Sequence, residues 1–392
     1  MRILHSEWSD GWGGQERRIL LECEGLQARG HYVEIVTRES CWIAKQAEIR
    51  GIPVSFIKMR RNFDPAATIQ LARHLRKGRF DILNTHSGID SWIGGLAAKL
   101  AGTPVLVRTR HLHIPFWRSP LNFVHYLPDR IFCISESMRH ILIEERGFPA
   151  KQIINIPTGI DLENFVPTSS RAVVRTKLEV PENHFVVLVV GVIRSVKCQD
   201  IALTAFAQMI AAGIKSTLII AGDGPVRQEM ERLAERLNIT KHVRFLGQRD
   251  DIPDLMQAAD VLLLTSRSEA IPQVLNQALS LGLAAVATAV GGVPEVIIHE
   301  NTGLLVPPNA VDAVVAALLR LIHEPMLAKK FAVAGRRHVI KRYGLLRMLD
   351  DTERSYCEVL AEKGLFPSTE LGAPTHPVAD AVSSACTKGF FR

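Results

Sequence analysis

Short apolar runs alternate with helical patterns along almost the whole chain. The runs are rich in β-branched residues, and between most of them apolar positions recur with a helical spacing. This alternation is typical of parallel sheets built from βαβ units. Strands are predicted at residues 2–5, 32–37, 54–57, 82–85, 105–109 and 131–134, then at 185–190, 217–221, 243–246, 261–264 and 284–287. Helices are predicted at 15–29, 65–77, 90–101, 136–146, 200–211, 226–237, 272–281 and 310–323.

The pattern divides into two series, separated by a polar segment without periodicity at 156–167. The chain has 392 residues, more than one hydrophobic core usually holds, so two domains are expected. We predict an α/β protein with two facing doubly wound, Rossmann-like domains, at 1–167 and 168–344. A helix at 345–362 should complete the first domain. Residues 366–392 are rich in Pro, Ala, Ser and Thr and should form a disordered tail.

The composition is that of an ordinary globular protein, with 47% hydrophobic and 22% charged residues. No apolar run reaches the length of a transmembrane helix, and the first residues turn polar too soon for a signal peptide. The six cysteines are scattered without CxxC or metal-ligand spacing, so reduced thiols are expected. We therefore expect a cytoplasmic protein.

The formal net charge of +7 concentrates in one short segment. Seven cations there face a single acid, Asp64: Lys58, Arg60, Arg61, Arg73, Arg76, Lys77 and Arg79. Such a basic cluster can attract an anionic membrane surface, nucleic acid or an acidic ligand, and it can equally be a solvated helix face. No nucleic-acid-binding module with interleaved aromatics is present, so no nucleic-acid partner is expected.

Glycines and cations follow strands at one predicted edge of each sheet, where ligands of open α/β sheets bind. Gly13 and Gly14 open the helix after the first strand, and they either let the backbone approach a ligand or form a tight turn. Gly191 begins a loop after the first strand of the second series. In this loop Arg194 and Lys197 can neutralise a diphosphate, or can be surface cations. A dinucleotide fingerprint is missing, so a nicotinamide cofactor is not expected.

The most informative stretch follows the fourth strand of the second series. Glu269 precedes a helix that Pro272 starts, and the free amides of Gln273 and Val274 in its first turn can bind phosphate. Gln277 lies one turn further, on roughly the same face as Gln273. A lone acid here could merely complement the helix dipole. The acid and the amides together favour half of a nucleotide-sugar site.

Histidines and aromatic residues follow strands of the first domain. His86 and His111 follow two different strands at the same edge, where either chemistry or a structural role would suit them. Arg110 and His113 flank His111 in a segment that stays aromatic and basic as far as Tyr126. Such a segment can lie in a membrane interface or pack as an ordinary loop. Because no HxxxH or HExxH spacing occurs, no metal site is expected.

In these motifs the chain resembles the retaining glycosyltransferases of family 4, which have the GT-B fold. The resemblance spans roughly residues 1 to 362, and the joint order of the motifs is more specific than any one of them. The motifs are Gly13-Gly14-x-Glu16, Thr109-x-His111, Ile134-Ser135-Glu136, Ile156-Pro157-Thr158-Gly159-Ile160-Asp161 followed by Phe165, Gly191 to Lys197, Gly222-Asp223-Gly224-Pro225, and Glu269 through Pro294-Glu295.

The resemblance implies that a nucleotide-diphosphate sugar binds mainly to the second domain and an acceptor mainly to the first. Transfer would retain the anomeric configuration and need neither a metal nor a cofactor. By position, Arg194 and Lys197 would hold the diphosphate, and the amides of Gln273 and Val274 would bind phosphate. Gln277 would meet the ribose hydroxyls.

The resemblance also assigns the reacting centre. Glu269 would bind hydroxyls of the donor sugar, and Gly13 and Gly14 would approach the donor from across the cleft. His111 would line the reacting centre, so Glu269, His111 and Lys197 are the catalytic candidates.

The acceptor-side candidates are His86, Arg110 and His113. The aromatic and basic segment that extends to Tyr126, together with the basic cluster, suggests a lipid-linked or cell-envelope glycan acceptor of lipopolysaccharide type. The protein would then act in the cytoplasm, peripherally on the inner face of the membrane.

Two departures from the family pattern bear on activity. Gln277 stands where the family has a second glutamate, and Val192 stands where it has an arginine directly after Gly191. A glutamine accepts a weaker hydrogen bond than a carboxylate. A catalytically silent sugar-nucleotide-binding protein is therefore one alternative, and a GT-B sugar-nucleotide epimerase is another. With no second carboxylate positioned as a nucleophile, the working hypothesis is front-face transfer rather than double displacement.

Overall fold

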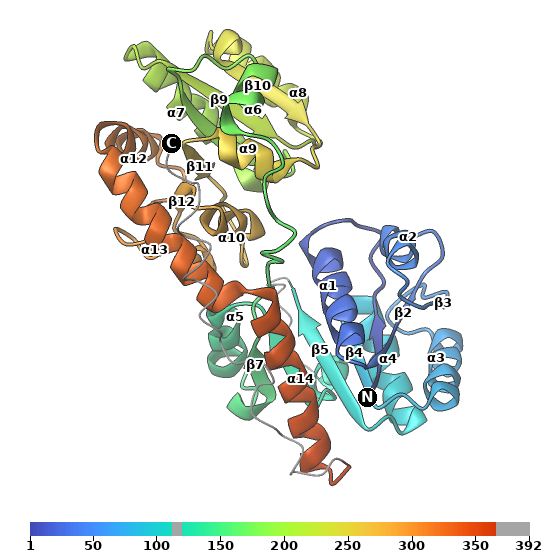
Figure 1. Ribbon diagram of the computed structural model, residues 1–392. Coiled ribbons are helices and arrows are strands. Elements are labelled where there is room, and N and C mark those ends of the chain that lie inside the picture. Colours follow the sequence, from blue (N-terminus) through green and yellow to red (C-terminus); the bar gives the residue numbers. More distant parts are fainter. Residues whose placement is uncertain (112–119, 366–392) are drawn as a thin grey trace.

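The structure is a computed structural model that describes residues 1–111 and 120–365, in two α/β domains (Figure 1). The first domain has a seven-stranded sheet of order β3-β2-β1-β4-β5-β6-β7, and all of its strand pairs are parallel. Its strands are β1 (Arg2–Ser6), β2 (Tyr32–Thr37), β3 (Val54–Phe56), β4 (Ile82–Thr85), β5 (Val105–Arg110), β6 (Arg130–Cys133) and β7 (Ile153–Asn155).

The second domain has a six-stranded parallel sheet of order β10-β9-β8-β11-β12-β13. The predicted fold class, two doubly wound domains, is therefore confirmed. Its strands are β8 (Phe185–Val190), β9 (Ser216–Ala221), β10 (Val243–Gly247), β11 (Val261–Leu264), β12 (Ala284–Thr288) and β13 (Leu304–Val306).

Helices cover both faces of each sheet. Those of the first half are α1 (Gly14–Ala28), α2 (Trp42–Ile49), α3 (Pro65–Gly78), α4 (Gly88–Ala101) and α5 (Glu136–His140). Those of the second half are α6 (Arg171–Lys177), α7 (Gln199–Ala211), α8 (Arg227–Arg236), α9 (Ile252–Ala258), α10 (Gln273–Ser280), α11 (Val293–Val296), α12 (Val311–His323), α13 (Pro325–Tyr343) and α14 (Leu345–Glu362). None of the helices in the described part of the chain combines the length and apolarity needed to cross a bilayer.

Local sequence signals account for most of these elements, and helix α3 is an example. Asp64 caps it by accepting a hydrogen bond from the Ala67 amide at 3.1 Å, and Pro65 occupies its first turn. Arg76 and Lys77 lie in its last turn, where cations complement the helix dipole. Two of the seven cations of the basic cluster therefore also complement the C-terminal end of α3.

Every predicted strand is present, but several observed elements were not predicted, among them the 19-residue helix α13. Strands β7 and β13, of three residues each, were also not predicted. The helix predicted at 136–146 is wrong in its second half, because α5 ends at His140 and a π-helical turn follows at Ile141–Glu145.

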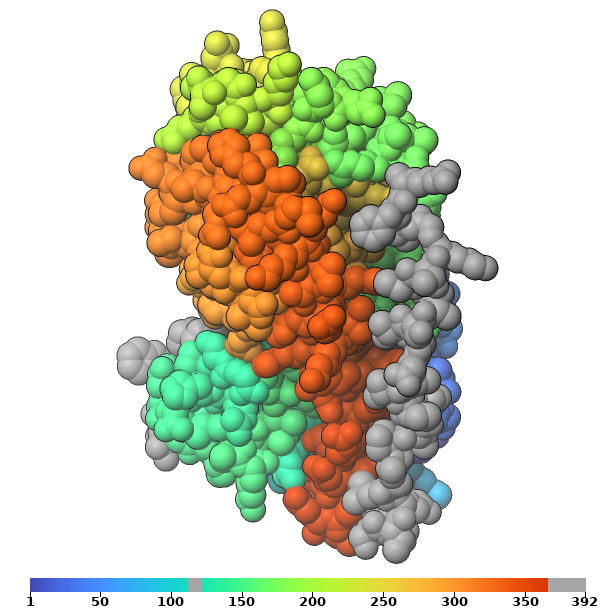
Figure 2. All heavy atoms as spheres, turned by 60° about the vertical axis from the view of Figure 1, so that its left-hand side comes forward, coloured from blue at the N-terminus to red at the C-terminus, as the bar shows by residue number. Residues whose placement is uncertain are grey.

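The two domains share a continuous contact region. One apolar cluster joins Ile131, Met138 and Phe148 of the first domain to residues of α10 and α13 in the second. Helix α13 leads into α14, and Figure 2 shows this orange-to-red run extending over both domains. Helix α14 packs against α1, where Tyr356 is fully buried. The last helix, α14, therefore packs on the first domain, where the chain begins.

The chain crosses between the domains twice, and the crossings lie side by side. The amide of Ile160 donates to the Tyr343 carbonyl at 2.8 Å, and the amide of Leu345 donates to the Ile160 carbonyl at 3.0 Å. A Cβ on Gly159 would lie 2.6 Å from the Cα of Leu345, so only glycine allows this approach. The segment predicted as a linker is thus hydrogen-bonded to the second crossing.

Glu295 connects the domains beside these crossings. Its carboxylate accepts hydrogen bonds from the amides of Glu136 at 2.8 Å and Ser137 at 3.0 Å, at the start of α5. Its backbone carbonyl accepts from Tyr343 Oη at 3.1 Å. A side chain of the second domain therefore caps a helix of the first.

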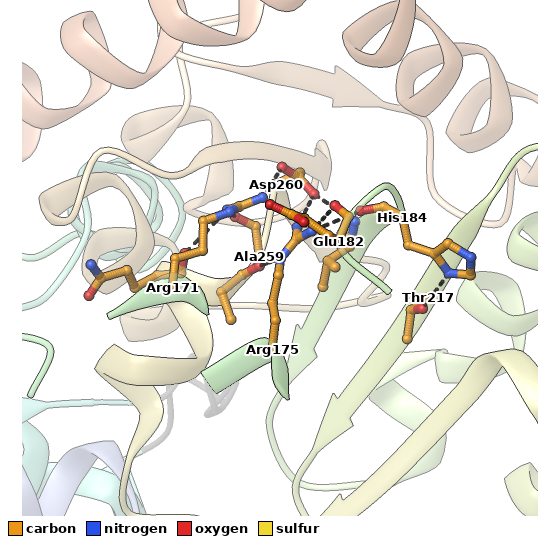
Figure 3. A network of polar contacts seen from close by, with 10 residues as sticks. Arg171, Arg175, Glu182, His184, Thr217, Ala259 and Asp260 are labelled. Carbon is orange, nitrogen blue, oxygen red and sulfur yellow. Dashed lines mark hydrogen bonds and ion pairs between the residues drawn. The ribbon is translucent and has the colours of Figure 1, made fainter. Parts of the chain in front are cut away.

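Within the second domain, Asp260 fixes the first helix to the sheet (Figure 3). Its carboxylate accepts from Arg171 at 2.6 Å, from Arg175 at 2.7 Å and from the Val186 amide at 2.7 Å. Burial, opposed by Asp260, lowers the pKa of Arg175, which still stays charged at neutral pH. The network orients β8, whose carboxyl end opens into the site.

Candidate functional site

The carboxyl ends of β8, β9, β11 and β12 meet at one edge of the second sheet, and their loops pack backbone against backbone. A Cβ on Gly291, whose φ is +51°, would lie 1.8 Å from the Glu269 carbonyl oxygen. A Cβ on Gly222, whose φ is +150°, would lie 1.9 Å from the Gly191 carbonyl oxygen. Glycine is therefore required at these positions, and it brings the predicted loops into contact.

Lys197 and Glu269 form an ion pair at this edge. Lys197 ends the 3₁₀ turn Ser195–Lys197, and its Nζ lies 2.5 Å from Glu269 Oε1. The same carboxylate oxygen accepts from Ser266 Oγ at 2.6 Å. Thr265 Oγ1 donates to the Cys198 carbonyl at 2.7 Å, which ties the two loops together. Two residues that the sequence placed in separate motifs are thus in direct contact.

Two helix N-termini face each other between the domains. Helix α1 begins at Gly14 and helix α10 at Gln273, and the Gln273 Cγ would lie 3.9 Å from a Cβ placed on Gly14. Pro272, the N-cap of α10, has no side-chain group that could cap the first amides of this helix. The positive ends of two helix dipoles therefore meet here, an arrangement that favours an anionic ligand.

A cleft of about 620 Å³, the interdomain cleft, opens between these helix starts. Gly13, Gly14, Gln273 and Gln277 line it, together with the loop of Asp223 from the second domain. Further lining comes from residues that the sequence reasoning missed: Trp12, Arg17, Asn164, Gln248, Arg249 and Asp250. Both domains thus contribute to one ligand-sized cavity, as expected for facing α/β domains.

A second cavity of about 430 Å³, the first-domain cavity, lies at the carboxyl edge of the first sheet. Three of the predicted residues line it, His86, Arg110 and His111. His113 lies outside the described residues. Gln15 of helix α1 lines this cavity, whereas Gly13 and Gly14 line the interdomain cleft. The start of α1 therefore separates two adjoining cavities.

Three buried histidines form a hydrogen-bonded chain that ends in the first-domain cavity. His5 Nδ1 lies 2.9 Å from His86 Nε2, and His86 Nδ1 lies 3.0 Å from His111 Nε2. Burial is the largest cause that lowers the pKa of all three, and it lowers those of His86 and His111 well below the usual value. All three rings are therefore neutral at neutral pH.

The chain of histidines has a preferred direction. In a neutral imidazole one nitrogen donates and the other accepts. His5 Nε2 is buried without a hydrogen-bond partner among the described residues. A proton there would be an unpaired buried N–H, which is rarer than an unpaired acceptor. We therefore assign the protons to the Nδ1 atoms of His5 and His86, which leaves the His111 proton on Nδ1.

Comparison with known proteins identifies the family. The model of Glycosyltransferase Family 4 matches residues 12–164, and the model of Glycosyl transferases group 1 matches residues 170–338. Together they span both domains. The chain belongs to the family 4, group 1 glycosyltransferases.

A curated relative of this family matches nearly the whole chain. The UDP-Gal:alpha-D-GlcNAc-diphosphoundecaprenol alpha-1,3-galactosyltransferase of Escherichia coli is 27% identical over 381 residues, which cover 93% of this chain and 98% of the relative.

Solved structures share the fold. A glycosyltransferase of Rickettsia africae has a TM-score of 0.82 at 21% identity, covering 92% of this chain and 98% of its own. HepE of Anabaena, solved in complex with UDP, has a TM-score of 0.82 at 22% identity, covering 91% of this chain and 99% of its own. These likenesses support the GT-B architecture.

Several of the glycosyltransferase's predicted donor-binding residues do not line the interdomain cleft. Arg194 is exposed and is not among the described residues that line the cleft. Val192, where the family pattern has an arginine, does line it. Val274, Lys197 and Glu269 lie at the edge but outside the cleft lining. Of the two predicted phosphate-binding cations, Arg194 is thus exposed, and Lys197 is held at the sheet edge by its ion pair with Glu269.

Sequence reasoning missed several residues of the glycosyltransferase's first-domain cavity. Arg108 precedes Arg110 by two positions on β5, a spacing that places both on one side of the strand. Two arginines at the carboxyl end of a buried strand could have indicated this cavity. Trp92 of helix α4 gave no such signal, whereas His125, in the 3₁₀ helix Pro120–Tyr126, belongs to the aromatic and basic segment already recognised in the sequence. Among the described residues, no group of three or more His, Cys, Asp or Glu could hold a metal ion.

Proposed function

We propose that this glycosyltransferase transfers a sugar, with retention, from a nucleotide-diphosphate sugar to a lipid-linked or other cell-envelope glycan acceptor of lipopolysaccharide type. The observation that carries the proposal is the meeting of the α1 and α10 N-termini across the interdomain cleft, beside the Lys197–Glu269 pair. A diphosphate is the ligand chemistry that suits such a site.

The departing diphosphate gains negative charge as its bond to the sugar breaks. Lys197 and the first-turn amides of α10 would stabilise that charge, which accelerates the reaction because the interaction strengthens in the transition state. Glu269 would exchange its ion pair with Lys197 for hydrogen bonds to hydroxyls of the donor sugar. The ion pair thus keeps both groups in place until the donor binds.

Retention would follow from a front-face transfer. The acceptor hydroxyl attacks the anomeric carbon from the side on which the diphosphate leaves, and its proton passes to a phosphate oxygen. A double displacement needs a free carboxylate nucleophile at that carbon. Glu269 is paired with Lys197 and lies outside the lining of the interdomain cleft, whose carboxylates are Asp161, Asp223 and Asp250. The pairing of Glu269 favours the front-face route.

Two observations support a lipid-linked acceptor. The name of the Escherichia coli relative specifies a diphosphoundecaprenol-linked acceptor. All seven cations of the basic cluster are exposed, and exposed Phe63 lies within the same segment. Cations beside an aromatic ring suit the surface of an anionic membrane. We therefore propose a cytoplasmic protein that binds the inner face of the membrane peripherally.

The decisive experiment measures donor use and product stereochemistry. The protein is incubated with UDP-, GDP- and ADP-sugars, starting with UDP-galactose, and with a short-chain lipid-diphosphate GlcNAc acceptor. We expect release of nucleoside diphosphate and a product whose anomeric proton coupling in NMR matches the donor. Transfer should continue in EDTA, since no metal or cofactor takes part in the proposed reaction. An inverted product would refute the retaining mechanism.

Acceptor-free incubations discriminate between the alternatives. A transferase releases nucleoside diphosphate slowly from its donor even without acceptor, whereas a silent binding protein releases none. An epimerase would convert the donor into a second nucleotide sugar. Sedimentation with anionic liposomes at low salt tests the membrane proposal separately, and Arg73→Glu with Arg76→Glu should weaken that binding.

A further inference from the structure

A buried carboxylate joins three elements beside the first-domain cavity. Glu7 follows β1 directly and is fully buried. Its Oε2 accepts from Gln15 Nε2 of helix α1 at 2.5 Å. Its Oε1 accepts from the Ser9 amide at 2.7 Å and from the hydroxyl of Ser87, the N-cap of α4. Because Gln15 Nε2 also donates to Ser87 Oγ at 3.1 Å, the side chains of Glu7, Gln15 and Ser87 close a ring of hydrogen bonds.

The chemistry of the donors fixes the direction of these hydrogen bonds. A backbone amide and a side-chain NH2 group can only donate, so both oxygens of Glu7 act as acceptors. Burial raises the pKa of Glu7, whereas the hydrogen bonds from Ser87, Ser9 and Gln15 lower it, because they favour the unprotonated carboxylate. The side-chain amide of Gln15 is assigned accordingly, with its NH2 group toward Glu7.

This orientation determines what Gln15 can offer to a ligand. Its Nε2 carries two protons, and they go to Glu7 and Ser87. The remaining polar atom of the side chain is the carbonyl oxygen Oε1, an acceptor with two lone pairs. Gln15 is half-buried and lines the first-domain cavity. The group that Gln15 can offer to a ligand in this cavity is therefore an acceptor.

The support of Gln15 is itself fixed from helix α4. The Ser87 carbonyl accepts a hydrogen bond from the Ser91 hydroxyl, one turn further along the chain. Asp90 Oδ2 accepts from the His86 amide at 2.8 Å, which holds the turn that precedes the helix. A polar group that its neighbours already hold in place needs little reorganisation when a ligand binds. Gln15 is thus pre-organised for one contact.

Gln15 lies at the boundary between the two cavities. The preceding residue, Gly14, lines the interdomain cleft, where Gln273 lies across from it. Trp8 and Trp92 contribute aromatic side chains to the lining of the first-domain cavity. A few polar groups among apolar and aromatic walls typically fix the orientation of a bound ligand. An acceptor in the first-domain cavity reaches the donor past the start of α1, where Gln15 lies.

We propose that Gln15 Oε1 accepts a hydrogen bond from a hydroxyl of the acceptor sugar other than the attacking one, and that Glu7 positions Gln15 for this contact. The inference rests on the proposed function, in which the proton of the attacking hydroxyl passes to the departing phosphate. Gln15 then orients the sugar through a second hydroxyl and selects acceptors that carry a donor there. Gln15 is a specificity-determining residue, and Glu7, which acts through it, is a positioning residue.

Deoxy acceptors test the contact. The short-chain lipid-diphosphate GlcNAc is compared with analogues in which each sugar hydroxyl in turn is replaced by hydrogen. Calorimetry with saturating UDP gives the acceptor Kd, and transfer assays give kcat/KM. In the wild type, loss of the selected hydroxyl should weaken binding about 3- to 10-fold, the size of one neutral hydrogen bond. This loss should disappear in Gln15→Leu and persist in the control Gln70→Leu, on the exposed face of α3.

Glu7→Gln tests the positioning. The new amide can donate to Gln15 Oε1, so Gln15 should turn and offer its NH2 group to the cavity. A fluorine in place of the selected hydroxyl cannot donate but can accept. The wild type should bind the fluoro and deoxy analogues equally, whereas Glu7→Gln should bind the fluoro analogue about threefold more tightly. A purely structural role of Glu7 would lower all affinities and leave this order unchanged, and Glu39→Gln, at an exposed position, is the control.

Thermal unfolding verifies that each variant is folded, and Gln15→Met replaces Gln15→Leu if the latter does not fold. The inference is overturned if every loss persists without Gln15, if Glu7→Gln leaves the order of the analogues unchanged, or if the wild type binds no acceptor. Failure of the proposed function has a different signature. A wild-type protein that binds the acceptor but neither hydrolyses donors nor transfers sugar refutes the transferase, while the Kd values still decide the Gln15 contact.

Discussion

Lys197 Nζ lies 2.5 Å from Glu269 Oε1, so an ion pair joins the loops that follow β8 and β11. These two strands are neighbours in the second sheet. The side chains are 21% and 10% exposed, so the pair is neither fully buried nor freely solvated. A diphosphate that reached this edge would compete with Glu269 for the Lys197 ammonium, which couples donor binding to the release of the carboxylate.

Replacing Lys197 by alanine should impair turnover more than acceptor binding. A charge-assisted hydrogen bond to the leaving group contributes about 2–3 kcal/mol in the transition state, so kcat should fall about 30- to 150-fold. The acceptor KM should change less than twofold. Steady-state kinetics measures both, and Lys215→Ala, at an exposed position of the same domain, is the control. Intact turnover in Lys197→Ala would show that the phosphate assignment is wrong.

Replacing Gln277 by glutamate should strengthen nucleotide binding. Gln277 lines the interdomain cleft one turn from Gln273, where the family pattern has a carboxylate. Hydrogen bonds from hydroxyls to a carboxylate are roughly twice as strong as those to a neutral amide, so the Kd for UDP should fall about 3- to 10-fold. Calorimetry with UDP measures this. Gln70→Glu on the exposed face of α3 should leave it unchanged, and weaker binding in Gln277→Glu would place the ribose elsewhere.

Acidification should destabilise the protein through the histidine chain. The pKa values of His5, His86 and His111 are lowered in the folded state, mainly by burial. Below about pH 6.5 the unfolded chain therefore binds more protons, and stability falls as the pH falls, by up to about 1.4 kcal/mol per pH unit for each histidine. Burial raises the pKa values of Glu7 and Asp90, so these two groups oppose the trend.

A variant isolates the histidine contribution from that of the acids. His86→Gln keeps hydrogen-bonding groups but cannot take up the proton, so its loss of stability between pH 6.5 and pH 5 should be smaller by up to about 1.4 kcal/mol per pH unit. Thermal unfolding at several pH values measures the difference. His299→Gln, whose side chain is 53% exposed, should behave as the wild type. A wild-type protein equally stable at both pH values would contradict the neutral chain.

The histidine chain also shows what the sequence could have predicted. His5, His86 and His111 lie at or just beyond the ends of β1, β4 and β5, which are adjacent in the sheet. A doubly wound sheet has parallel strands that end at one edge, so the three rings could have been placed together once the strand order was assumed. Their hydrogen bonds depend on ring orientation, which the sequence does not specify.

Other parts of the site needed the tertiary structure. The approach of Gly14 to Gln273 depends on how the two domains face each other, and no local pattern encodes that angle. Strand alternation places Arg108 and Arg110 on one side, but whether a helix or a cavity covers that side follows from packing alone. The strands were predictable because their apolar runs are buried on both faces, which is the strongest signal of a parallel sheet.

Glu295 should control how the domains are joined. Its carboxylate accepts from the amides of Glu136 and Ser137, and it lies 3.6 Å from Arg342 Nη2. Replacing Glu295 by alanine removes a helix cap that crosses the domain boundary, a loss of about 0.5–2 kcal/mol. Hydrogen exchange of the Glu136 and Ser137 amides should then become faster, while exchange in α3 should not change.

The kinetic consequence separates a domain contact from a donor contact. If Glu295 acts only by holding α5, Glu295→Ala should lower kcat/KM for transfer less than about tenfold, because the contact it removes is worth at most one cap. Glu295→Gln keeps an acceptor oxygen and should retain most of the amide protection. Glu300→Gln, an exposed carboxylate paired with Arg320, is the matched control. A loss as large as that of Lys197→Ala, with amide protection unchanged, would show that Glu295 contacts the donor instead.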